Sequence, residues 1–417
     1  MINKEPAVKG ISELSYEKSN PRMVEHDRTK KDLGIYIHIP FCERKCNYCD
    51  FLSAPADDTV KEKYVSALRN EIRSYQGLAN QYNVRTIYIG GGTPSSIHED
   101  YITSILSDLY HIFEIKKKEE LEITIEANPG TLTKHKLLSY KDAGINRLSI
   151  GLQSANNEEL KLLGRIHTFE EFVANYNLAR KVGFDNINID VISSLPNQTE
   201  QAYLDSLMKV VALNPEHISS YSLIIEEGTL FEKFYGEGSE HSKELPSEDV
   251  DRTIYEDTKT VLKEYGYERY EISNYAKVGF ESKHNSSYWT RTEYLGIGLG
   301  ASSLIGDARY HNENNLNQYI DCVSNQESLR REEEKLSGNN QMEEFMFLGL
   351  RMCRGISKKR FCEVFEKDIQ EVYGSILTKL LDEKLIMEQE DYICLTERGL
   401  DLSNYVFSEF LLDEESE

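Results

Sequence analysis

From residue 34 onward, short β-rich runs alternate with longer stretches whose apolar residues recur at helical spacing, and this alternation limits the fold most strongly. Strands that alternate with helices pair in parallel through right-handed crossovers, which predicts an α/β barrel or an open α/β sheet. Ligands bind at the carboxyl ends of the strands in such folds, so the residues after each strand are site candidates. The six predicted strands are residues 35–39, 86–89, 121–125, 147–150, 187–189 and 217–222.

The first predicted strand runs directly into three closely spaced cysteines, Cys42, Cys46 and Cys49. A short loop can wrap three thiolates around one inorganic centre, and soft thiolates suit iron–sulfur clusters or zinc. A structural zinc site is usually closed by four protein ligands, whereas a cubane cluster on three cysteines leaves one iron open to a small molecule. Because His38 could supply a fourth ligand, a zinc knuckle stays open as the alternative to a [4Fe–4S] cluster.

The spacing C-x3-C-x2-C, with Tyr48 before the last cysteine, resembles the radical S-adenosylmethionine (SAM) superfamily. The flanking sequences YIHIPFC, which contains Tyr36, and CDF resemble the family of oxygen-independent coproporphyrinogen III dehydrogenases and their paralogous haem chaperones. The resemblance implies a partial (β/α)6 barrel in which Cys42, Cys46 and Cys49 hold a [4Fe–4S] cluster and SAM chelates the unique iron. It also places Tyr36 and Tyr48 among the cofactor-binding residues.

Small or polar residues follow the second to fifth predicted strands, where a ligand should bind. Glycines there permit positive φ or a close backbone approach, and a buried carboxylate there needs hydrogen-bond donors. The resemblance assigns the matching positions to SAM or to the SAM and substrate region. These candidate cofactor-binding residues are Gly91, Gly92, Thr93, Glu126, Gln153, Arg165 and Asp190. Taken singly, the glycines also fit a tight turn and Arg165 also fits an ion pair with Asp190, but joint placement at successive strand ends favours a ligand site.

Beyond the fifth strand the sequence departs from the family pattern, which has glycines at the positions of Ser194 and Asn197. Asparagine tolerates the left-handed conformation, so the turn can be kept. Residues 231–246 are acidic and contain Gly and Ser, which predicts a long surface loop before a helix over residues 250–265. A tyrosine-rich strand is predicted over residues 267–275.

The only tryptophan of the chain ends the sequence HNSSYW. A histidine near two aromatic rings offers an axial nitrogen beside flat π surfaces, which suits haem, and a packed aromatic corner with a hydrogen-bonded histidine is the alternative. By resemblance, the motif HN-x-x-YW is associated with haem binding in the chaperone branch, which assigns His284, Asn285, Tyr288 and Trp289 to haem. The glycine-rich residues 296–301 resemble the return strand of the family beside SAM.

A charged segment, residues 330–340, is predicted to separate a small C-terminal domain. Its predicted helices and short strand pair, with a last helix capped by Thr396, indicate a winged-helix-like module and resemble the C-terminal domain of the same family. DNA binding is the general use of that shape, but we favour a lid or partner surface over the cleft because the chain is acidic. We therefore expect a poorly ordered polar extension, a radical SAM core and a small domain. Their predicted boundaries are residues 1–33, 34–329 and 340–417.

The formal net charge of −23, from 71 acidic and 48 basic residues, disfavours nucleic acid as a partner. No apolar run approaches the roughly 20 residues of a membrane span, and the N-terminal segment lacks the apolar core of a signal peptide. The other four cysteines are scattered rather than arranged as a disulfide framework, which fits a reducing compartment. These features predict a cytoplasmic protein.

The resemblance leaves two functions open. A haem chaperone captures haem and delivers it to an acceptor protein, whereas a coproporphyrinogen III dehydrogenase decarboxylates its substrate oxidatively. By resemblance, the dehydrogenase branch carries a further cysteine two positions after the third cluster cysteine, where this chain has Phe51. Because Phe51 replaces that cysteine and HN-x-x-YW is present, we predict a haem chaperone. It would carry a [4Fe–4S] cluster, SAM and haem, and would act with an electron donor and a haem-accepting protein.

Overall fold

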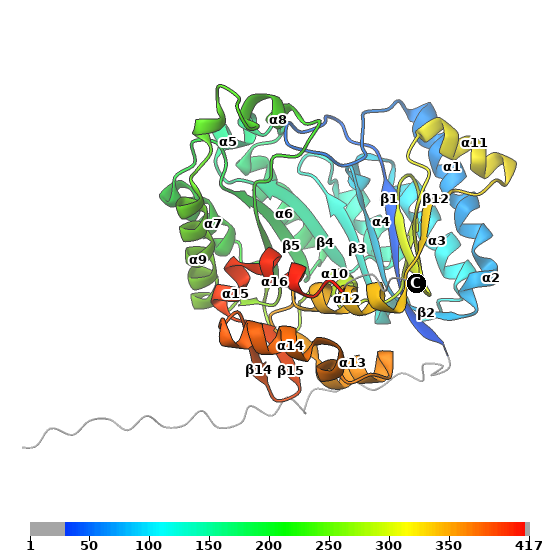
Figure 1. Cartoon of the computed structure of the whole chain (residues 1–417). Helices are drawn as coiled ribbons and strands as arrows, with labels where there is room; N and C mark the ends of the chain where they lie inside the picture. The colour runs from blue at the N-terminus through cyan, green and yellow to red at the C-terminus, as the bar shows by residue number, and fades with distance from the viewer. Residues whose placement is uncertain (1–29, 413–417) are drawn as a thin grey trace, which may run out of the picture.

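A twelve-stranded sheet organises the protein, whose computed structural model describes residues 30–412 (Figure 1). Its six central strands pair in parallel and follow one another in chain order, as a partial (β/α)6 barrel requires. They are β1 (Lys31–Ile39), β2 (Tyr82–Gly91), β3 (Glu122–Ala127), β4 (Arg147–Gln153), β5 (Ile187–Ser193) and β6 (His217–Ser222). The predicted fold class is therefore confirmed.

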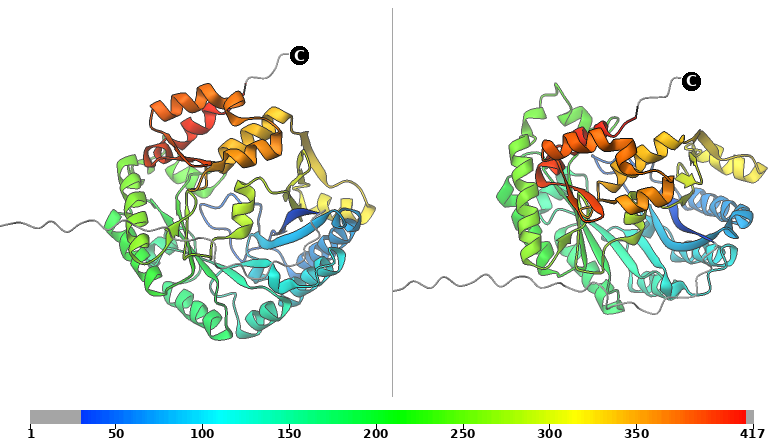
Figure 2. Two further views of the ribbon diagram at one scale, coloured as in Figure 1. Left: turned by 90° about the horizontal axis from the view of Figure 1, so that it is seen from below. Right: turned by 60° about the horizontal axis from the view of Figure 1, so that its bottom comes forward.

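Helices between the strands cover the outer face of the sheet (Figure 2). The long ones are α1 (Asp58–Ser74), α3 (Glu99–Ile112), α4 (Lys134–Ala143), α6 (Phe169–Val182), α7 (Glu200–Ala212) and α9 (Glu248–Glu264). The short helix α2 (Gln76–Ala79) follows α1, whereas α5 (Asn157–Leu162) and α8 (Leu230–Tyr235) lie at one end of the barrel, beside Asn47 (Figure 1). The predicted helix over residues 169–182 is confirmed at both ends, because Thr168 and Glu171 form a capping box and Gly183 closes the helix in the left-handed conformation.

The two faces of the parallel strands differ in polarity. Alternate residues such as Ile35, Ile37 and Ile39 are fully buried on the helix-covered face. The residues between them form polar layers inside the barrel, which is unusual because barrel interiors are commonly filled by branched apolar side chains. One layer pairs Tyr36, Tyr88, Thr124 and Arg147 across four strands, and the next pairs Glu126, Ser149, Asn188 and His217.

Further strands extend both edges of the parallel sheet. On the β1 side, β9 (Tyr294–Ile297) pairs in parallel, followed by the antiparallel strands β10 (Ser302–Ile305), β11 (Ala308–Asn312) and β12 (Arg330–Lys335). On the β6 side lie β8 (Asn274–Ala276) and β7 (Glu268–Arg269). Helices α10 (Lys283–Trp289) and α11 (Leu316–Asn325) connect these strands.

Four local predictions need correction. The charged segment over residues 330–340 is not a separator, because its first half is β12, whose backbone pairs with β11. The single strand over residues 267–275 is a hairpin of β7 and β8. The loop over residues 231–246 begins with α8, which buries Phe231 and Tyr235. Residues 1–29 of the predicted extension lie outside the described residues, but residues 31–33 belong to β1 because they pair with the start of β2.

The C-terminal elements have a hydrophobic core of their own. They are α12 (Gly338–Gly349), β13 (Ile356–Ser357), α13 (Lys358–Phe365), α14 (Ile369–Asp382), β14 (Ile386–Gln389), β15 (Tyr392–Leu395), α15 (Glu397–Asp401) and α16 (Ser403–Glu409). The three strands form a small antiparallel sheet. Thr396 caps a helix as predicted, but this helix is α15, and α16 follows it.

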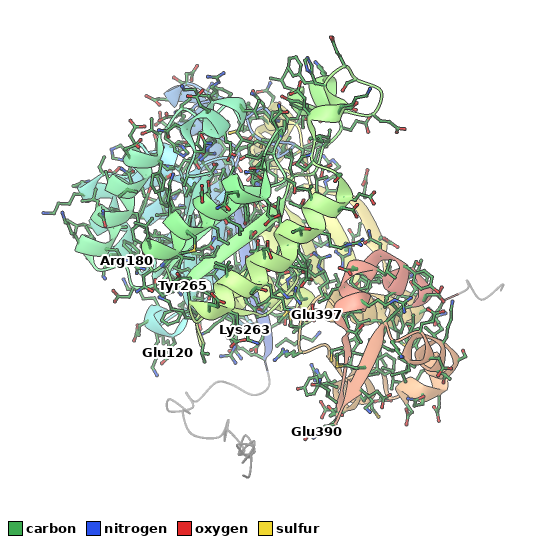
Figure 3. All side chains as sticks on the ribbon, turned by 90° about the vertical axis from the view of Figure 1, so that its left-hand side faces the viewer. Glu120, Arg180, Lys263, Tyr265, Glu390 and Glu397 are labelled. Carbon is green, nitrogen blue, oxygen red and sulfur yellow. The ribbon has the colours of Figure 1, made fainter. Side chains whose placement is uncertain are left out.

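This small domain packs at the end of the barrel opposite the cysteines (Figure 1). Arg291 and Arg309 from the barrel both pair with Glu344 of α12, at 2.9 and 2.7 Å. Glu397 lies at the boundary between the small domain and the barrel (Figure 3). Its carboxylate pairs with Lys259 and Arg269. The prediction of a lid over the cleft is therefore wrong, because these ion pairs hold the domain against the end of the barrel opposite the cysteines. This end is called the floor of the barrel below.

Glu71 joins the added strands to the barrel. Its buried carboxylate accepts from the Gly298 backbone at 2.9 Å, from Asn312 at 2.7 Å and from the hydroxyl of Tyr319 at 2.5 Å. These donors come from the end of β9, from β11 and from α11, so one side chain of α1 connects three later elements.

We predict that Glu71→Ala lowers the free energy of unfolding by about 3 kcal/mol, because it leaves several buried donors unpaired. Urea denaturation would measure the change. Glu62→Ala, at an exposed position of the same helix, should change it by less than about 0.5 kcal/mol. Equal effects of the two substitutions would contradict a connecting role for Glu71.

Candidate functional site

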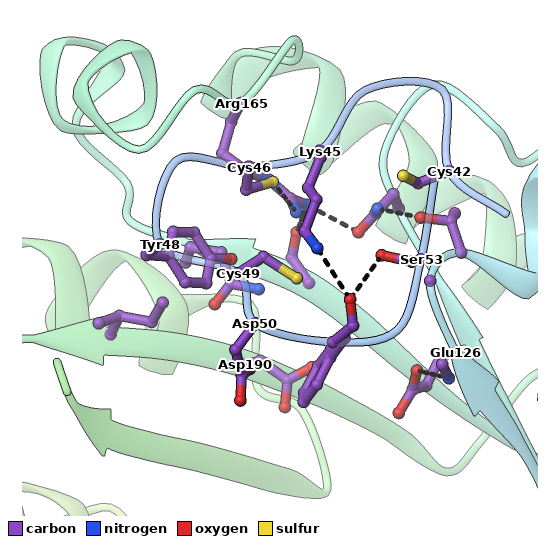
Figure 4. A pocket seen from close by; sticks show the side chains of 18 of the residues that line it. Cys42, Lys45, Cys46, Tyr48, Cys49, Asp50, Ser53, Glu126, Arg165 and Asp190 are labelled. Atoms are coloured by element: carbon purple, nitrogen blue, oxygen red, sulfur yellow. Dashed lines mark hydrogen bonds between the residues drawn. The ribbon is translucent and has the colours of Figure 1, made fainter. Parts of the chain in front are cut away.

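A cavity of about 390 Å³ lies at the carboxyl ends of the parallel strands (Figure 4). Parallel pairing brings these ends to one edge, where residues from different strands and loops can meet. The predicted site residues that line the cavity are Cys42, Cys46, Tyr48, Cys49, Gly91, Gly92, Thr93, Glu126, Gln153, Arg165 and Asp190.

The cysteine loop, residues 40–54, is closed by backbone contacts at its base. The Ala54 N–H donates to the carbonyl of Pro40 at 3.0 Å, and the Thr93 N–H donates to the carbonyl of Phe41 at 2.7 Å. His38 fixes the returning end of the loop, since its Nε2 contacts the Leu52 carbonyl at 2.9 Å while its Nδ1 contacts the hydroxyl of Tyr36. His38 is thus not directed toward the cysteines as a fourth ligand.

Two glycines at the end of β2 allow the loop to lie this close. Gly91 has a φ of 115°, and its backbone N–H donates to Oε2 of Glu126 at 3.1 Å. A Cβ on Gly92 would lie 2.6 Å from the carbonyl oxygen of Phe41. Any larger residue at this position would push the cysteine loop away from β2.

The three cysteines line one cavity. Within residues 30–412, no group of three or more His, Cys, Asp or Glu side chains is arranged to hold one metal ion. The ligands of a cubane bind different irons, so their sulfurs can lie further apart around one cavity. Burial raises the pKa of the Cys42 and Cys49 thiols. Bound iron would be what holds them as thiolates.

Glu126 presents its carboxylate to the cavity from β3. The hydroxyl of Tyr88 donates to Oε1 at 2.9 Å, and the Gly91 N–H donates to Oε2. Burial raises the pKa of Glu126 to about 7, and the two donors oppose that rise. The charge of Glu126 therefore depends on the donors from Tyr88 and Gly91.

Arg165 reaches back toward the cysteine loop. Its Nη2 donates to the side-chain oxygen of Asn128 and to the Gly151 carbonyl, both at 2.7 Å, and its Nη1 lies 3.6 Å from the sulfur of Cys46. The alternative ion pair with Asp190 is not what holds the guanidinium. Such a fork can orient Cys46 and still face a carboxylate in the cavity.

The ends of β4 and β5 complete the cavity wall. Asn188 and Ser149 donate to Asp190 at 2.8 and 3.1 Å, and burial raises the pKa of its carboxyl. Gln153 has a φ of 74°, a conformation uncommon for residues other than glycine. The turn after β5 is kept as expected, because Ser194 and Asn197 both adopt the left-handed conformation, with φ of 59° and 58°.

The remaining predicted residues lie elsewhere, at the floor of the barrel. His284 on α10 is 1% exposed; its Nδ1 contacts the hydroxyl of Thr86 at 2.7 Å and its Nε2 that of Tyr288 at 2.8 Å. Burial and nearby Arg147 lower the pKa of His284 to about 3. Trp289 packs under the guanidinium of Arg351.

Two further predicted residues also lie below the cavity. Asn285 is half-buried in the first turn of α10, and Tyr36 lies inside the barrel beside Tyr88. The structure thus separates the predicted haem motif from the cysteine cavity. Both ring nitrogens of His284 contact hydroxyls, so an axial bond to haem iron would have to replace one of these contacts.

Comparison with known proteins assigns the family. The radical SAM superfamily pattern matches residues 36–210, and the HemN C-terminal domain pattern matches residues 336–402. "Heme chaperone HemW" of Bacillus subtilis is 37% identical over 91% of this chain and 99% of the relative. This chain belongs to the HemW family. "Heme chaperone HemW" of Lactococcus lactis subsp. lactis is also 37% identical, over 92% of this chain and 99% of the relative.

A solved structure agrees with this assignment. Coproporphyrinogen III oxidase (HemN) from Escherichia coli, a radical SAM enzyme, has a TM-score of 0.80 and 25% identity, and covers 92% of this chain and 91% of that one. The predicted family is confirmed. Membership of the radical SAM superfamily implies a [4Fe–4S] cluster and SAM.

Sequence reasoning missed two cavity residues. Tyr88 donates a hydrogen bond to Glu126. Asn128 connects Arg165 to Thr93, because its side-chain oxygen accepts from Arg165 and its side-chain nitrogen donates to the Thr93 hydroxyl at 2.7 Å. Tyr88 alternates with buried isoleucines in β2, and this inward position was the signal that could have revealed it.

Within residues 30–412, no helix is both long enough and apolar enough to span a membrane.

We predict that replacing Cys42, Cys46 and Cys49 together with alanine removes the cluster iron and sulfide from the reconstituted protein, because the cavity loses its thiolates. Chemical analysis of iron and sulfide would measure the loss. Cys362→Ala, at an exposed position of α13, should retain both. A full complement of iron and sulfide in the triple variant would contradict the assignment of these ligands.

Proposed function

We propose that this protein is a haem chaperone, which binds haem and delivers it to an acceptor protein. The observation that carries this proposal is the 37% identity to proteins named heme chaperone HemW along almost their full length. The acceptor would be a haem-binding protein, and an electron donor would serve the cluster.

We assign the cluster to Cys42, Cys46 and Cys49, and SAM to the neighbouring cavity wall. The backbone carbonyls of Gly91 and Gly92 and the carboxylate of Glu126 are acceptors suited to the amino group of SAM. When bound, the cluster supplies the electron for reductive chemistry on SAM. The residues that we expect to hold SAM further along the wall are Tyr48, Thr93, Gln153, Arg165 and Asp190.

The cavity and its loop support the chaperone rather than the dehydrogenase. Phe51 lines the cavity mouth and is 60% exposed, at the position where the dehydrogenase branch is expected to carry a cysteine. A phenyl ring cannot ligate iron or transfer hydrogen as a thiol can. Ile224, which also lines the cavity, is 67% exposed.

His284 remains our predicted haem ligand, together with Asn285, Tyr288 and Trp289 around it. An imidazole binds iron through an unprotonated nitrogen. Both nitrogens of His284 contact hydroxyls here, so ligation requires the contact with Thr86 or with Tyr288 to break.

We predict that an anaerobic haem titration of the cluster-reconstituted protein gives stoichiometric binding with a Soret band. His284→Ala should weaken binding by at least about tenfold, or shift the band, because the axial nitrogen is lost. Absorbance spectra across the titration would measure both effects.

A matched control is His98→Ala, since His98 has an exposed side chain at the N-cap of α3. It should bind haem like the unaltered protein. If the unaltered protein binds no haem, the chaperone proposal is wrong, and coproporphyrinogen III with SAM and a reductant becomes the next substrate to offer. If His284→Ala binds haem identically, only the ligand assignment is wrong.

A further inference from the structure

Tyr88 lies between the haem motif and the cavity. It occupies the inner face of β2, paired with Tyr36 on one side and Thr124 on the other. Its ring stacks on the imidazole of His284, with centroids 5.1 Å apart and planes 23° apart, and its hydroxyl donates to Glu126 at 2.9 Å. One rigid side chain therefore contacts both sites.

His284 holds this ring from below. Helix α10 lies near the middle of the ring of strands when the molecule is viewed from the floor (Figure 2). The imidazole of His284 is held in position by Thr86 and Tyr288, and it does not line the cysteine cavity. A movement or loss of this imidazole would remove the surface on which Tyr88 is stacked.

Glu126 is the group in the cavity whose charge depends on the position of Tyr88. The hydroxyl of Tyr88 and the N–H of Gly91 favour its charged form. The other charged and titratable groups that act on Glu126 or on Tyr88 come from β1, β4, β5 and α10. They are Tyr36, Arg147, Asp190, Tyr288 and His284. Of these, Arg147 favours the carboxylate and Asp190 opposes it.

We propose that Tyr88 is a positioning residue that couples His284 at the floor of the barrel to Glu126 in the SAM cavity, so that a change at His284 alters the affinity for SAM. This inference rests on the proposed contact between Glu126 and SAM. The coupling needs no movement of the backbone, because stacking and one hydrogen bond connect the two sites. By linkage, if a ligand at His284 changes the affinity for SAM by a given factor, bound SAM changes the affinity for that ligand by the same factor.

The first test measures SAM binding to the full-length, cluster-reconstituted protein under anaerobic conditions, across a pH range that brackets the pKa of Glu126 near 7. Tyr88→Phe keeps the ring and loses the hydroxyl. We expect affinity near neutral pH to fall by about tenfold, as for the loss of a hydrogen bond to a charged group.

The pH profile gives a second readout. Without the Tyr88 hydroxyl the pKa of Glu126 rises, so the part of the profile that depends on the carboxylate should move to higher pH. Titration of SAM itself is common to both proteins and cancels in their comparison. In a protein that already carries Glu126→Gln, Tyr88→Phe should leave the pH profile unchanged, since no carboxylate remains to be tuned.

The second test changes the distant end. His284→Ala should lower SAM affinity severalfold although His284 does not touch the cavity, and the double variant with Tyr88→Phe should lose less than the sum of the two effects. The control is Ser282→Ala, which removes the N-cap of α10 without contacting Tyr88. It should bind SAM normally.

The inference is overturned if His284→Ala binds SAM like the unaltered protein, or if Ser282→Ala loses as much affinity as His284→Ala. Thermal unfolding and the cluster absorbance of each variant establish that it is folded. Should His284→Ala fail to fold, Tyr88→Phe alone decides, and an unchanged affinity and pH profile refute the coupling. Failure of the unaltered protein to bind SAM would instead contradict the proposed function.

Discussion

The close contact between the cysteine loop and the end of β2 is the constraint on which the site depends. Gly92 has no side chain, so the carbonyl of Phe41 can approach it and accept from the N–H of Thr93. The same approach carries Cys42 to the cavity wall, opposite the strands that bring Glu126 and Asp190. Without it the three thiolates and the strand-end carboxylates would not face one volume. The loop supplies the chemistry, and the end of β2 determines where that chemistry is placed.

The second constraint is the polar interior of the barrel. Arg147 is 1% exposed, and two of its guanidinium nitrogens have no partner within the described residues. Burying an unpaired charge is costly, and the nearby carboxylates of Glu126 and Asp190 offset that cost. Since burial raises the pKa of both carboxyls while Arg147 opposes the rise, the three charges depend on one another.

Much of this arrangement could be predicted from the sequence because it follows local rules. The alternation of strands and helices predicted the parallel core, and the cysteine spacing together with the strand-end residues predicted which side chains share the cavity. Glycine and asparagine conformations at Gly91 and Asn197 followed from their backbone preferences. Each of these inferences needs only neighbouring residues and the direction of a strand.

The errors come from contacts that are distant in sequence. The charged residues of β12 resemble a linker, because their pairing with β11 uses the backbone, which the side-chain pattern does not report. Tyr88 was missed because a tyrosine within a strand resembles core packing until Glu126 and His284 are seen on either side of it.

The predicted SAM site and the predicted haem site lie in different parts of the barrel, which limits how they can influence each other. The cysteine cavity opens at the carboxyl ends of the strands, whereas His284 is enclosed at their amino ends above the small domain. Tyr88 lies between His284 and the cavity in this arrangement, because its ring stacks on the imidazole and its hydroxyl donates to Glu126. The coupling proposed above would pass through this residue and the polar layers around it. A barrel filled with branched apolar side chains would have provided the same rigidity but no such path.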